Sequence, residues 1–462
     1  MGKKELALEE NFTFEIGGEI PERLRKNDKL DESKLKELLK DLPIKVGTLL
    51  KTDNVSFLLG AGASMEAGGV SLASIPLQVE DELLKDGIGE KRLRKWLALF
   101  YSAAEWVAEG DVQVPASRDA AIVRRENPAR DPLPVNYERL LSKLYQWQAA
   151  TQPGSKRLRL GGTKPEDPAE LDADPDAVSS CITRLKAALL KVCNLPNPAD
   201  EAAISTHAQF VKKVLTRPVN LRRAGIFTLN YDTLIEQAAD AEGVTMLEGF
   251  VGSIRHVFRP ESYDQDFYFP GDTTEGRVHR LDRVLHLYKL HGSLNWTSEN
   301  PSWSNPYGVA QDNQAADTDR ILIYPTPMKY GEVLGMPYSE MFRRFASHVV
   351  RPQSTLFVIG YSFSDDHVNA IIRQAFAIPS FTLVVIDPQV PTGGFVQTLR
   401  DQKDHRFWLI SGWQLGTFRK FVESVLPDLR ENEIEEKVAK TFRALNPTGE
   451  GELATGGDTD AK

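Results

Sequence analysis

The sequence predicts an α/β fold built on a doubly wound parallel sheet with a helical insertion. Short apolar segments recur along the chain, and strands that are buried on both faces of a sheet have this composition. Segments with helical periodicity stand between them, an order typical of parallel sheets. We expect strands at Val55–Leu59, Gly225–Thr228, Leu285–Leu290, Ile321–Tyr324, Thr355–Ile359, Thr382–Ile386 and Phe407–Ile410.

The helical segments and the loops between them divide the chain into regions. Helices are expected at 71–84, 91–107, 137–149, 177–192, 201–215 and 234–241, where apolar residues recur every three or four positions. Residues 51–109 and 200–430 are expected to form the sheet domain, and residues 110–199 a helical insertion with loops rich in Pro, Gly and charge. Residues 1–50, with a helix near Glu32–Leu42, form an N-terminal extension that packs on the domain or on a partner subunit. Residues 431–462 are expected to hold the end of a C-terminal helix and a disordered tail.

Composition excludes several classes of protein. The 462-residue chain has a net charge of −9, so no direct binding of nucleic acid is expected. Cys181 and Cys193 are the only cysteines, which excludes a disulfide scaffold and a four-cysteine zinc site. No apolar run approaches the roughly 20 residues that cross a bilayer, and the first residues lack the apolar core of a secretory signal. We therefore expect a soluble, cytoplasmic protein with no membrane contact.

Four short motifs place glycines or reactive side chains where the expected strands end. The first, Gly60-Ala61-Gly62-Ala63-Ser64, lies between a buried strand and a helix, the context of a phosphate-binding loop. Ligands bind in the crevice at the carboxyl ends of parallel strands, where glycines admit a phosphate and the next helix presents free N–H groups. Met65 occupies the third glycine position of the dinucleotide-binding pattern, so a glycine turn without a ligand is the alternative.

The second and third motifs carry candidate catalytic side chains. In Thr228-Leu229-Asn230-Tyr231-Asp232, Asp232 could simply cap the next helix, whereas Asn230 is not needed for that cap. In Lys289-Leu290-His291-Gly292-Ser293, a histidine stands at a strand end. A lone histidine is more often structural, but imidazole, with an ordinary pKa of about 6.5, is the natural general base at neutral pH.

The fourth motif, Gly360-Tyr361-Ser362-Phe363-Ser364-Asp365-Asp366, combines a glycine turn with a helix start. Ser364 is the expected N-cap, and the two following acids are explained as favourable charges in the first turn, so they are not candidates for catalysis. Gly360 and Ser362 are the better ligand candidates. Asp387 follows another expected strand, a position from which acids bind ribose hydroxyls in nucleotide-binding sheets.

Taken in this order, the four motifs resemble the sirtuin family, in its sirtuin-like bacterial branch. The resemblance covers roughly residues 53–390, without 110–200 and both ends. It implies a Rossmann-like NAD-binding domain in which His291 is the general base, while Asn230 and Asp232 order the nicotinamide ribose and the attacking water. It also implies binding of the pyrophosphate region by Ala61, Gly62 and Ser64, and of the phosphate and adenosine-ribose side by Gly360, Ser362 and Asp387.

The family's chemistry is cleavage of the bond between nicotinamide and ribose C1′. Deacylating sirtuins carry a four-cysteine zinc module, an acidic-aromatic-basic triplet after the glycine loop and a Gln before the Asn. None of these is present here, and Leu229 replaces the Gln. These differences argue against acetyl-lysine recognition and leave water as the nucleophile. The resemblance therefore implies an NAD⁺ glycohydrolase that takes NAD as its substrate, needs no metal, and forms ADP-ribose and nicotinamide.

Three alternatives remain open: an NAD-dependent protein deacylase, a non-catalytic sensor of NAD or ADP-ribose, and an unrelated dehydrogenase. Sirtuin-like proteins of the bacterial branch deplete NAD⁺ in anti-phage defence by abortive infection. The resemblance therefore also implies a homo-oligomer with a phage-sensing partner, for which a HerA-type ATPase is the first candidate. The N-terminal extension and the insertion are the expected contact surfaces, with Trp96, Trp106, Tyr145 and Trp147, although packing in a domain core is the commoner role of such residues.

Overall fold

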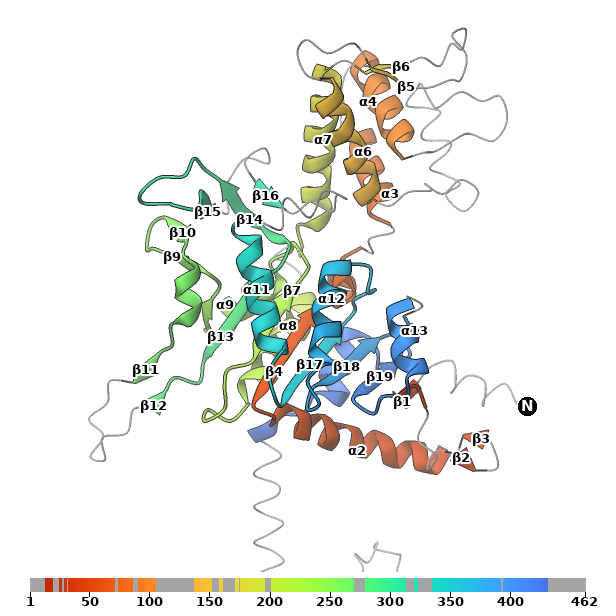
Figure 1. Cartoon of the computed structure of the whole chain (residues 1–462), viewed down its shortest axis with the longest axis vertical. Helices are drawn as coiled ribbons and strands as arrows, with labels where there is room; N and C mark the ends of the chain where they lie inside the picture. Colours follow the sequence, from red (N-terminus) through yellow and green to blue (C-terminus); the bar gives the residue numbers. More distant parts are fainter. Residues whose placement is uncertain are drawn as a thin grey trace, which may run out of the picture.

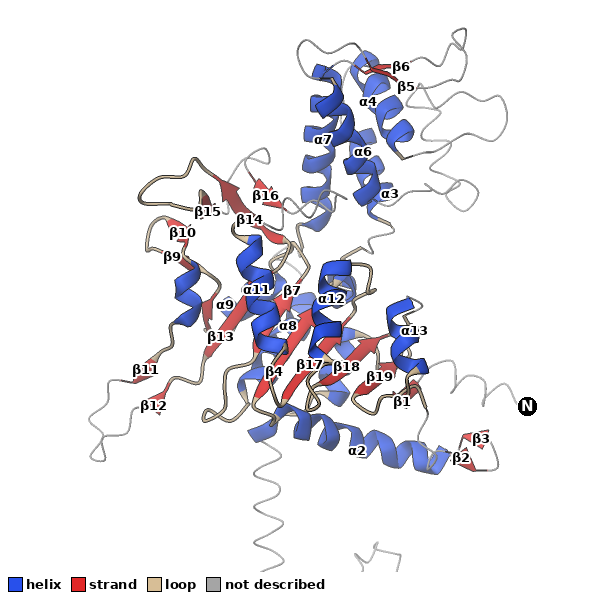
Figure 2. Ribbon diagram, in the orientation of Figure 1, coloured by secondary structure: helices blue, strands red, loops and turns tan. Residues whose placement is uncertain are grey.

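The computed structural model of the chain is built around an eight-stranded sheet (Figures 1 and 2). It describes residues 13–19, 25–26, 29–30, 32–70, 74–85, 90–104, 137–151, 158–160, 171–173, 175–195, 201–269, 279–312, 320–322, 335–391 and 394–430. The sheet has the strand order β1 (Thr13–Ile16), β19 (Phe407–Ser411), β18 (Thr382–Asp387), β17 (Ser354–Ile359), β4 (Asn54–Leu59), β7 (Gly225–Thr228), β13 (Val284–Lys289) and β8 (Thr245–Leu247).

This sheet is doubly wound. All its strands run parallel except β1, which pairs antiparallel with β19 at the edge. From β4 the chain first builds β7, β8 and β13 on one side, and it then crosses to β17, β18 and β19 on the other side. The predicted fold class is confirmed, and the point where the winding reverses lies between β4 and β17.

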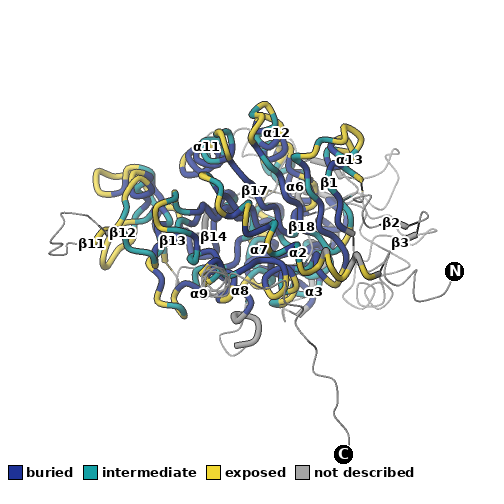
Figure 3. Tube along the Cα trace, turned by 90° about the horizontal axis from the view of Figure 1, so that it is seen from below, coloured by how far each residue is buried: buried dark blue, intermediate teal, exposed yellow. Residues whose placement is uncertain are grey.

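Helices cover both faces of the sheet, so the domain has three layers (Figure 3). One face packs against α2 (Glu32–Leu50), α8 (Glu201–Leu215), α9 (Leu234–Ala241), α14 (Phe418–Lys420) and the π-helical turn η6 (Phe421–Val425). The other packs against α11 (Tyr338–Val349), α12 (Asp366–Ala375) and α13 (Gly394–Asp401). Within β4, Phe57 and Leu59 face the first layer and Leu58 the second, because successive side chains of a strand point to opposite faces.

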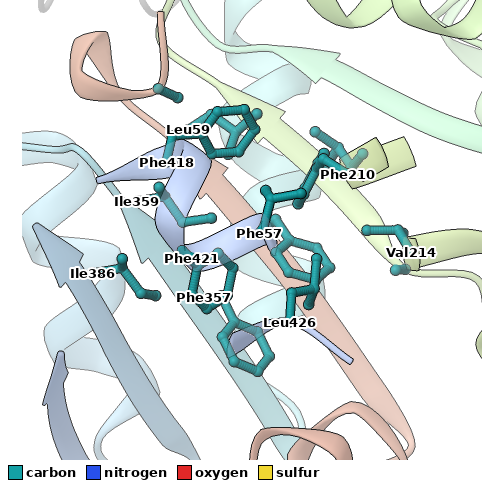
Figure 4. Packing of buried hydrophobic residues seen from close by; sticks show 14 of the residues in the cluster. Phe57, Leu59, Phe210, Val214, Phe357, Ile359, Ile386, Phe418, Phe421 and Leu426 are labelled. Carbon is teal, nitrogen blue, oxygen red and sulfur yellow. The ribbon is translucent and has the colours of Figure 1, made fainter. Parts of the chain in front are cut away.

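Aromatic packing holds the two central strands together (Figure 4). Phe57 of β4 stacks on Phe357 of β17 with ring centroids 5.1 Å apart, and it meets the edge of Phe210 of α8 at 5.1 Å. All three rings are fully buried. Because burying one such side chain contributes roughly 1.5–3 kcal/mol, these contacts hold β4 and β17 firmly at the switch point.

The N-terminal extension packs on the sheet domain, one of the two expected arrangements. Strand β1 pairs with the edge of the sheet, and helix α2 contributes Leu42, Val46 and Leu50 to the core. The helix continues past its expected end at Leu42, because Val46 and Leu50 extend the buried stripe beyond Pro43. A short ribbon of β2 (Arg25–Lys26) and β3 (Lys29–Leu30) precedes it.

A second, antiparallel sheet was not predicted. Its strand order is β16 (Arg320–Leu322), β14 (Gly292–Ser298), β15 (Val309–Gln311), β10 (His256–Phe258) and β9 (Phe250–Val251). The expected strand at 321–324 belongs to this sheet and not to the parallel one, because an apolar pattern identifies a strand but not its partner. The turn η4 (Pro260–Asp264) and a ribbon of β11 (Tyr268–Phe269) and β12 (His279–Arg280) complete this part of the fold.

The helical insertion is a bundle of α3 (Ile75–Lys85), α4 (Glu90–Ala103), α6 (Tyr137–Ala150) and α7 (Pro175–Cys193), on the side of the carboxyl ends of the parallel strands (Figure 1). These helices share one apolar core, so α3 and α4 pack with the insertion although they precede the expected boundary at residue 110. The difference arises because amphipathic helices look alike in sequence whichever core they join. The ribbon of β5 (Leu158–Leu160) and β6 (Leu171–Ala173) also lies within the insertion.

Three of the expected contact residues pack against the core of this bundle: Trp96, Tyr145 and Trp147. Trp106 and the expected C-terminal tail at 431–462 lie outside the described residues. None of the described helices combines the length and apolar character that a bilayer crossing requires.

Candidate functional site

The predicted site residues follow strands that end at one level of the sheet. In the strand register, Ile386, Ile359, Leu59, Thr228 and Lys289 stand side by side. The four motifs and Asp387 begin at these residues or immediately after them, so all of them lie along the same edge. Ligands of doubly wound sheets bind at this edge, next to the switch point.

Two glycine loops meet at the switch point. Gly360 has φ +61°, and a Cβ atom there would lie 2.4 Å from Gly62 Cα. Gly62 N donates to Gly360 O at 2.9 Å, so this amide ties the two loops together. Only glycine permits such a close approach of two backbones, which explains the glycines without assigning them to a phosphate.

The first loop differs from its expected continuation. It runs into two short 3₁₀ turns, η2 (Ala61–Ala63) and η3 (Met65–Ala67), and the first described residues of α3 begin only at Ile75. The expected N–H groups of an adjoining α-helix are therefore not part of this loop. Ala61 and Gly62 are half-buried at the carboxyl-end edge of the sheet.

Ser64, Asn230 and Asp232 form a chain of hydrogen bonds. Asn230 Nδ2 donates to Gly60 O at 2.9 Å and to Ser64 Oγ at 2.8 Å, and Ser64 Oγ donates to Asp232 Oδ2 at 2.7 Å. Both amide hydrogens of Asn230 are thereby engaged, so its Oδ1 is the atom with which it can accept a hydrogen bond from a bound molecule.

This chain changes the interpretation of two residues. Ser64 is buried and its hydroxyl lies between Asn230 and Asp232, not in the backbone cradle expected for a pyrophosphate. Asp232 is also buried, and its Oδ1 accepts from Leu234 N at 3.2 Å. It precedes Thr233, the N-cap of α9, so it does not hold the capping position considered as an alternative. The geometry makes Ser64 and Asp232 the support of the Asn230 side chain.

His291 faces a carboxylate from a distant loop. It lies in the turn between β13 and β14, and its Nε2 is 3.2 Å from Asp365 Oδ2, with side-chain exposures of 12% and 6%. Asp365 also caps α12, because its Oδ1 accepts from His367 N at 3.0 Å. The expected N-cap, Ser364, was therefore wrong by one residue.

Asp365 is the functional candidate that sequence reasoning dismissed. Capping a helix engages one carboxylate oxygen, and here the second oxygen is directed at His291. In a neutral imidazole one nitrogen donates and the other accepts, and the Asp365 carboxylate beside Nε2 favours protonation of that nitrogen. No local signal reveals the pair, because the two residues lie on loops that follow different strands.

The remaining candidates lie after β17 and at the end of β18. Ser362 is exposed, and its Oγ donates to Ser364 Oγ at 3.0 Å. Asp387 Oδ1 accepts from Gln389 N at 2.9 Å, and burial raises the pKa of its carboxyl to about 6. A partly desolvated carboxylate at a crevice is a frequent feature of functional sites.

Part of the chain is similar to a known domain family. Residues 224–404 match the family model of the SIR2-like domain. The SIR2-like match includes both candidate catalytic loops and the second glycine loop, whereas the loop at 60–64 precedes it. No curated protein matches the chain in sequence.

Solved structures of Sir2 homologues are similar to the chain at a low level. A Sir2 homologue in complex with NAD is 13% identical, with 86% of this chain and 94% of that chain covered and a TM-score of 0.35. A substituted Sir2 homologue in complex with 2′-O-acetyl ADP ribose is 13% identical, with 86% and 97% covered and a TM-score of 0.34. Among the residues that the structure describes, no group of three or more His, Cys, Asp or Glu could hold a metal ion.

Proposed function

We propose that the protein is an NAD⁺ glycohydrolase, which cleaves NAD⁺ to ADP-ribose and nicotinamide. The observation that carries this proposal is the pair of catalytic loops at the switch-point edge. One presents the Oδ1 of Asn230 and the other a histidine paired with Asp365. The match of residues 224–404 to the SIR2-like domain supports the assignment of this edge to NAD chemistry.

The proposed reaction breaks the bond between nicotinamide and ribose C1′ through an oxocarbenium-like state. Asn230 Oδ1 accepts a hydrogen bond from the attacking water or from a ribose hydroxyl and so orients it. The His291 imidazole takes a proton from the water as the water oxygen bonds to C1′, and the buried Asp365 carboxylate stabilises the resulting imidazolium. Nicotinamide leaves with the electron pair of the broken bond.

The other predicted residues are assigned supporting roles. Asp232 and Ser64 act through Asn230, because their hydrogen bonds fix its amide. Gly360 and Gly62 bring the two loops close enough for a pyrophosphate to lie beside their backbones. Asp387 and Ser362, beyond them, are proposed to bind the phosphate and adenosine-ribose side.

Hydrolysis is favoured over deacylation by the sequence. With two cysteines the chain cannot build the four-cysteine zinc module of deacylating sirtuins, and Leu229 replaces their Gln. An unrestrained NAD⁺ hydrolase would harm its own cell. The proposal therefore includes cytoplasmic action in anti-phage defence, as a homo-oligomer controlled by a partner such as a HerA-type ATPase.

The test is product analysis by chromatography, with NAD⁺ and the purified protein alone and together with its partner. Asn230→Ala and His291→Ala are each expected to lower turnover by about 10²–10⁴-fold. Asn54→Ala and His256→Ala are matched controls, because these side chains lie away from the crevice and should leave turnover unchanged. O-acyl-ADP-ribose formed from an acylated peptide would identify a deacylase, and saturable NAD binding without products under any activation would identify a sensor.

A further inference from the structure

Lys289 is a buried cation directly behind the candidate site. It is the last residue of β13, two positions before His291, and only 1% of it is exposed. Its ammonium donates to Asp232 O and to Glu236 Oε1, the latter at 2.8 Å, and it lies 3.5 Å from Tyr231 O. Burying an ammonium group is costly unless it is paired and hydrogen-bonded, so these contacts hold the side chain in one place.

The same two loops are joined at further points. Leu294 N donates to Tyr231 O at 3.0 Å, and Leu290 N donates to Thr228 O at 2.9 Å. Lys289 and Leu294 lie on either side of His291 in the chain, and both hold the backbone of the loop that carries Asn230. These contacts of Lys289 and Leu294 with the Asn230 loop, called the bracket below, therefore set the position of His291 relative to Asn230.

We propose that Lys289 is a positioning residue that holds the Asn230 loop and the His291 loop in register for catalysis. The inference rests on the proposed function, since it concerns the reaction at that site. Lys289 does not touch the crevice itself. It acts through the carbonyl groups of Tyr231 and Asp232, the two residues that follow Asn230 in the chain.

The alternative is a purely structural ion pair with Glu236. Burial raises the pKa of the Glu236 carboxyl, and Lys289 opposes this effect without cancelling it. Buried ion pairs of this kind can often be replaced by uncharged residues of similar volume without loss of stability. Removing both charges therefore separates stability from positioning.

The decisive variant is Lys289→Met combined with Glu236→Gln, which leaves no unpaired charge. It is expected to fold with stability near that of the wild type, to lose at least about tenfold in kcat, and to change the KM for NAD by less than about threefold. Lys213→Met is the matched control, because its ammonium likewise donates to two backbone carbonyls, those of Val422 and Leu426, but far from the crevice. It should retain its kcat even if its stability falls.

Each result decides the matter. Wild-type kcat in a stable double variant would overturn the proposal. Glu236→Gln alone keeps the carbonyl contacts of Lys289 and should retain kcat within about threefold; a tenfold loss there would assign the effect to the ion pair and also overturn the proposal.

Failure of the proposed function is recognised separately, by a wild type that forms no products from NAD⁺. Hydrogen exchange then tests the bracket itself. Faster exchange of the Leu290 and Leu294 amides in the double variant than in Lys213→Met would support the bracket, and unchanged exchange would refute it.

Discussion

Asp387→Asn is expected to stabilise the protein while weakening its binding of NAD. Burial raises the pKa of the Asp387 carboxyl from 3.8 to about 6, and the only described side-chain hydrogen bond to it comes from Gln389 N. The Asp387 carboxyl thus keeps its proton to a higher pH in the folded protein than in the unfolded chain. As pH rises from about 4 to about 6, the unfolded chain ionises first, and the folded state loses stability.

The size of the effect follows from the pKa difference of about two units. Because one unit corresponds to about 1.4 kcal/mol, the ionised Asp387 costs the folded protein about 3 kcal/mol at pH 7.5. Asparagine cannot ionise and can still accept from Gln389 N, so the variant avoids this cost. The stability gap should shrink to about 1 kcal/mol at pH 4.5, where the carboxyl is largely protonated in the folded state.

The assay is urea unfolding of both proteins at pH 7.5 and pH 4.5, with calorimetry of ADP-ribose binding at pH 7.5. Asp404→Asn is the control of opposite sign. The side-chain hydrogen bond from Arg406 lowers the pKa of the Asp404 carboxyl, so removal of the Asp404 charge should destabilise the protein. An Asp387→Asn variant no more stable than the wild type at pH 7.5, or a gap independent of pH, would refute the electrostatic reasoning. Unchanged affinity for ADP-ribose would refute the ribose-binding role alone.

Three further predictions concern other parts of the site and the fold. Asp365→Asn preserves the helix cap but removes the charge that pairs with His291. The kcat for NAD⁺ cleavage should therefore fall about 10–100-fold with little change in melting temperature. An unchanged kcat would remove Asp365 from the mechanism. Gly360→Ala should lower the free energy of unfolding by about 2 kcal/mol or more, since its Cβ would meet backbone at 2.4 Å and φ is +61°, and denaturant melts with wild-type midpoints would contradict this. Burial lowers the pKa of His286 and His348 to about 4, so the folded state resists protonation that the unfolded chain accepts, and stability should fall as pH drops from about 6.5 towards 4. Melting curves across this range test it, and His348→Gln should flatten the decline.

The sequence by itself determined the parallel sheet and the edge at which the candidate site residues lie. Apolar segments such as Val55–Leu59 that alternate with helices are typical of parallel strands buried on both faces, and parallel strands bring their carboxyl ends to one edge. The glycines, Asn230 and His291 stand directly after such strands, so their common location followed from local order. The helices at 201–215 and 234–241 were likewise determined by local periodicity.

Only the tertiary structure decided which atoms meet at that edge. Asp365 was explained as a favourable charge in the first turn of a helix, yet one of its oxygens reaches His291, 74 positions away in the chain. Ser64 was expected to face a pyrophosphate, but its hydroxyl bonds Asn230 and Asp232. Lys289 ends a strand, and only the folded chain brings its ammonium to the carbonyl group of Asp232. Side-chain contacts between loops depend on how the strands pack, and no local pattern of residues encodes them, because periodicity reports which face is buried and not what it is buried against.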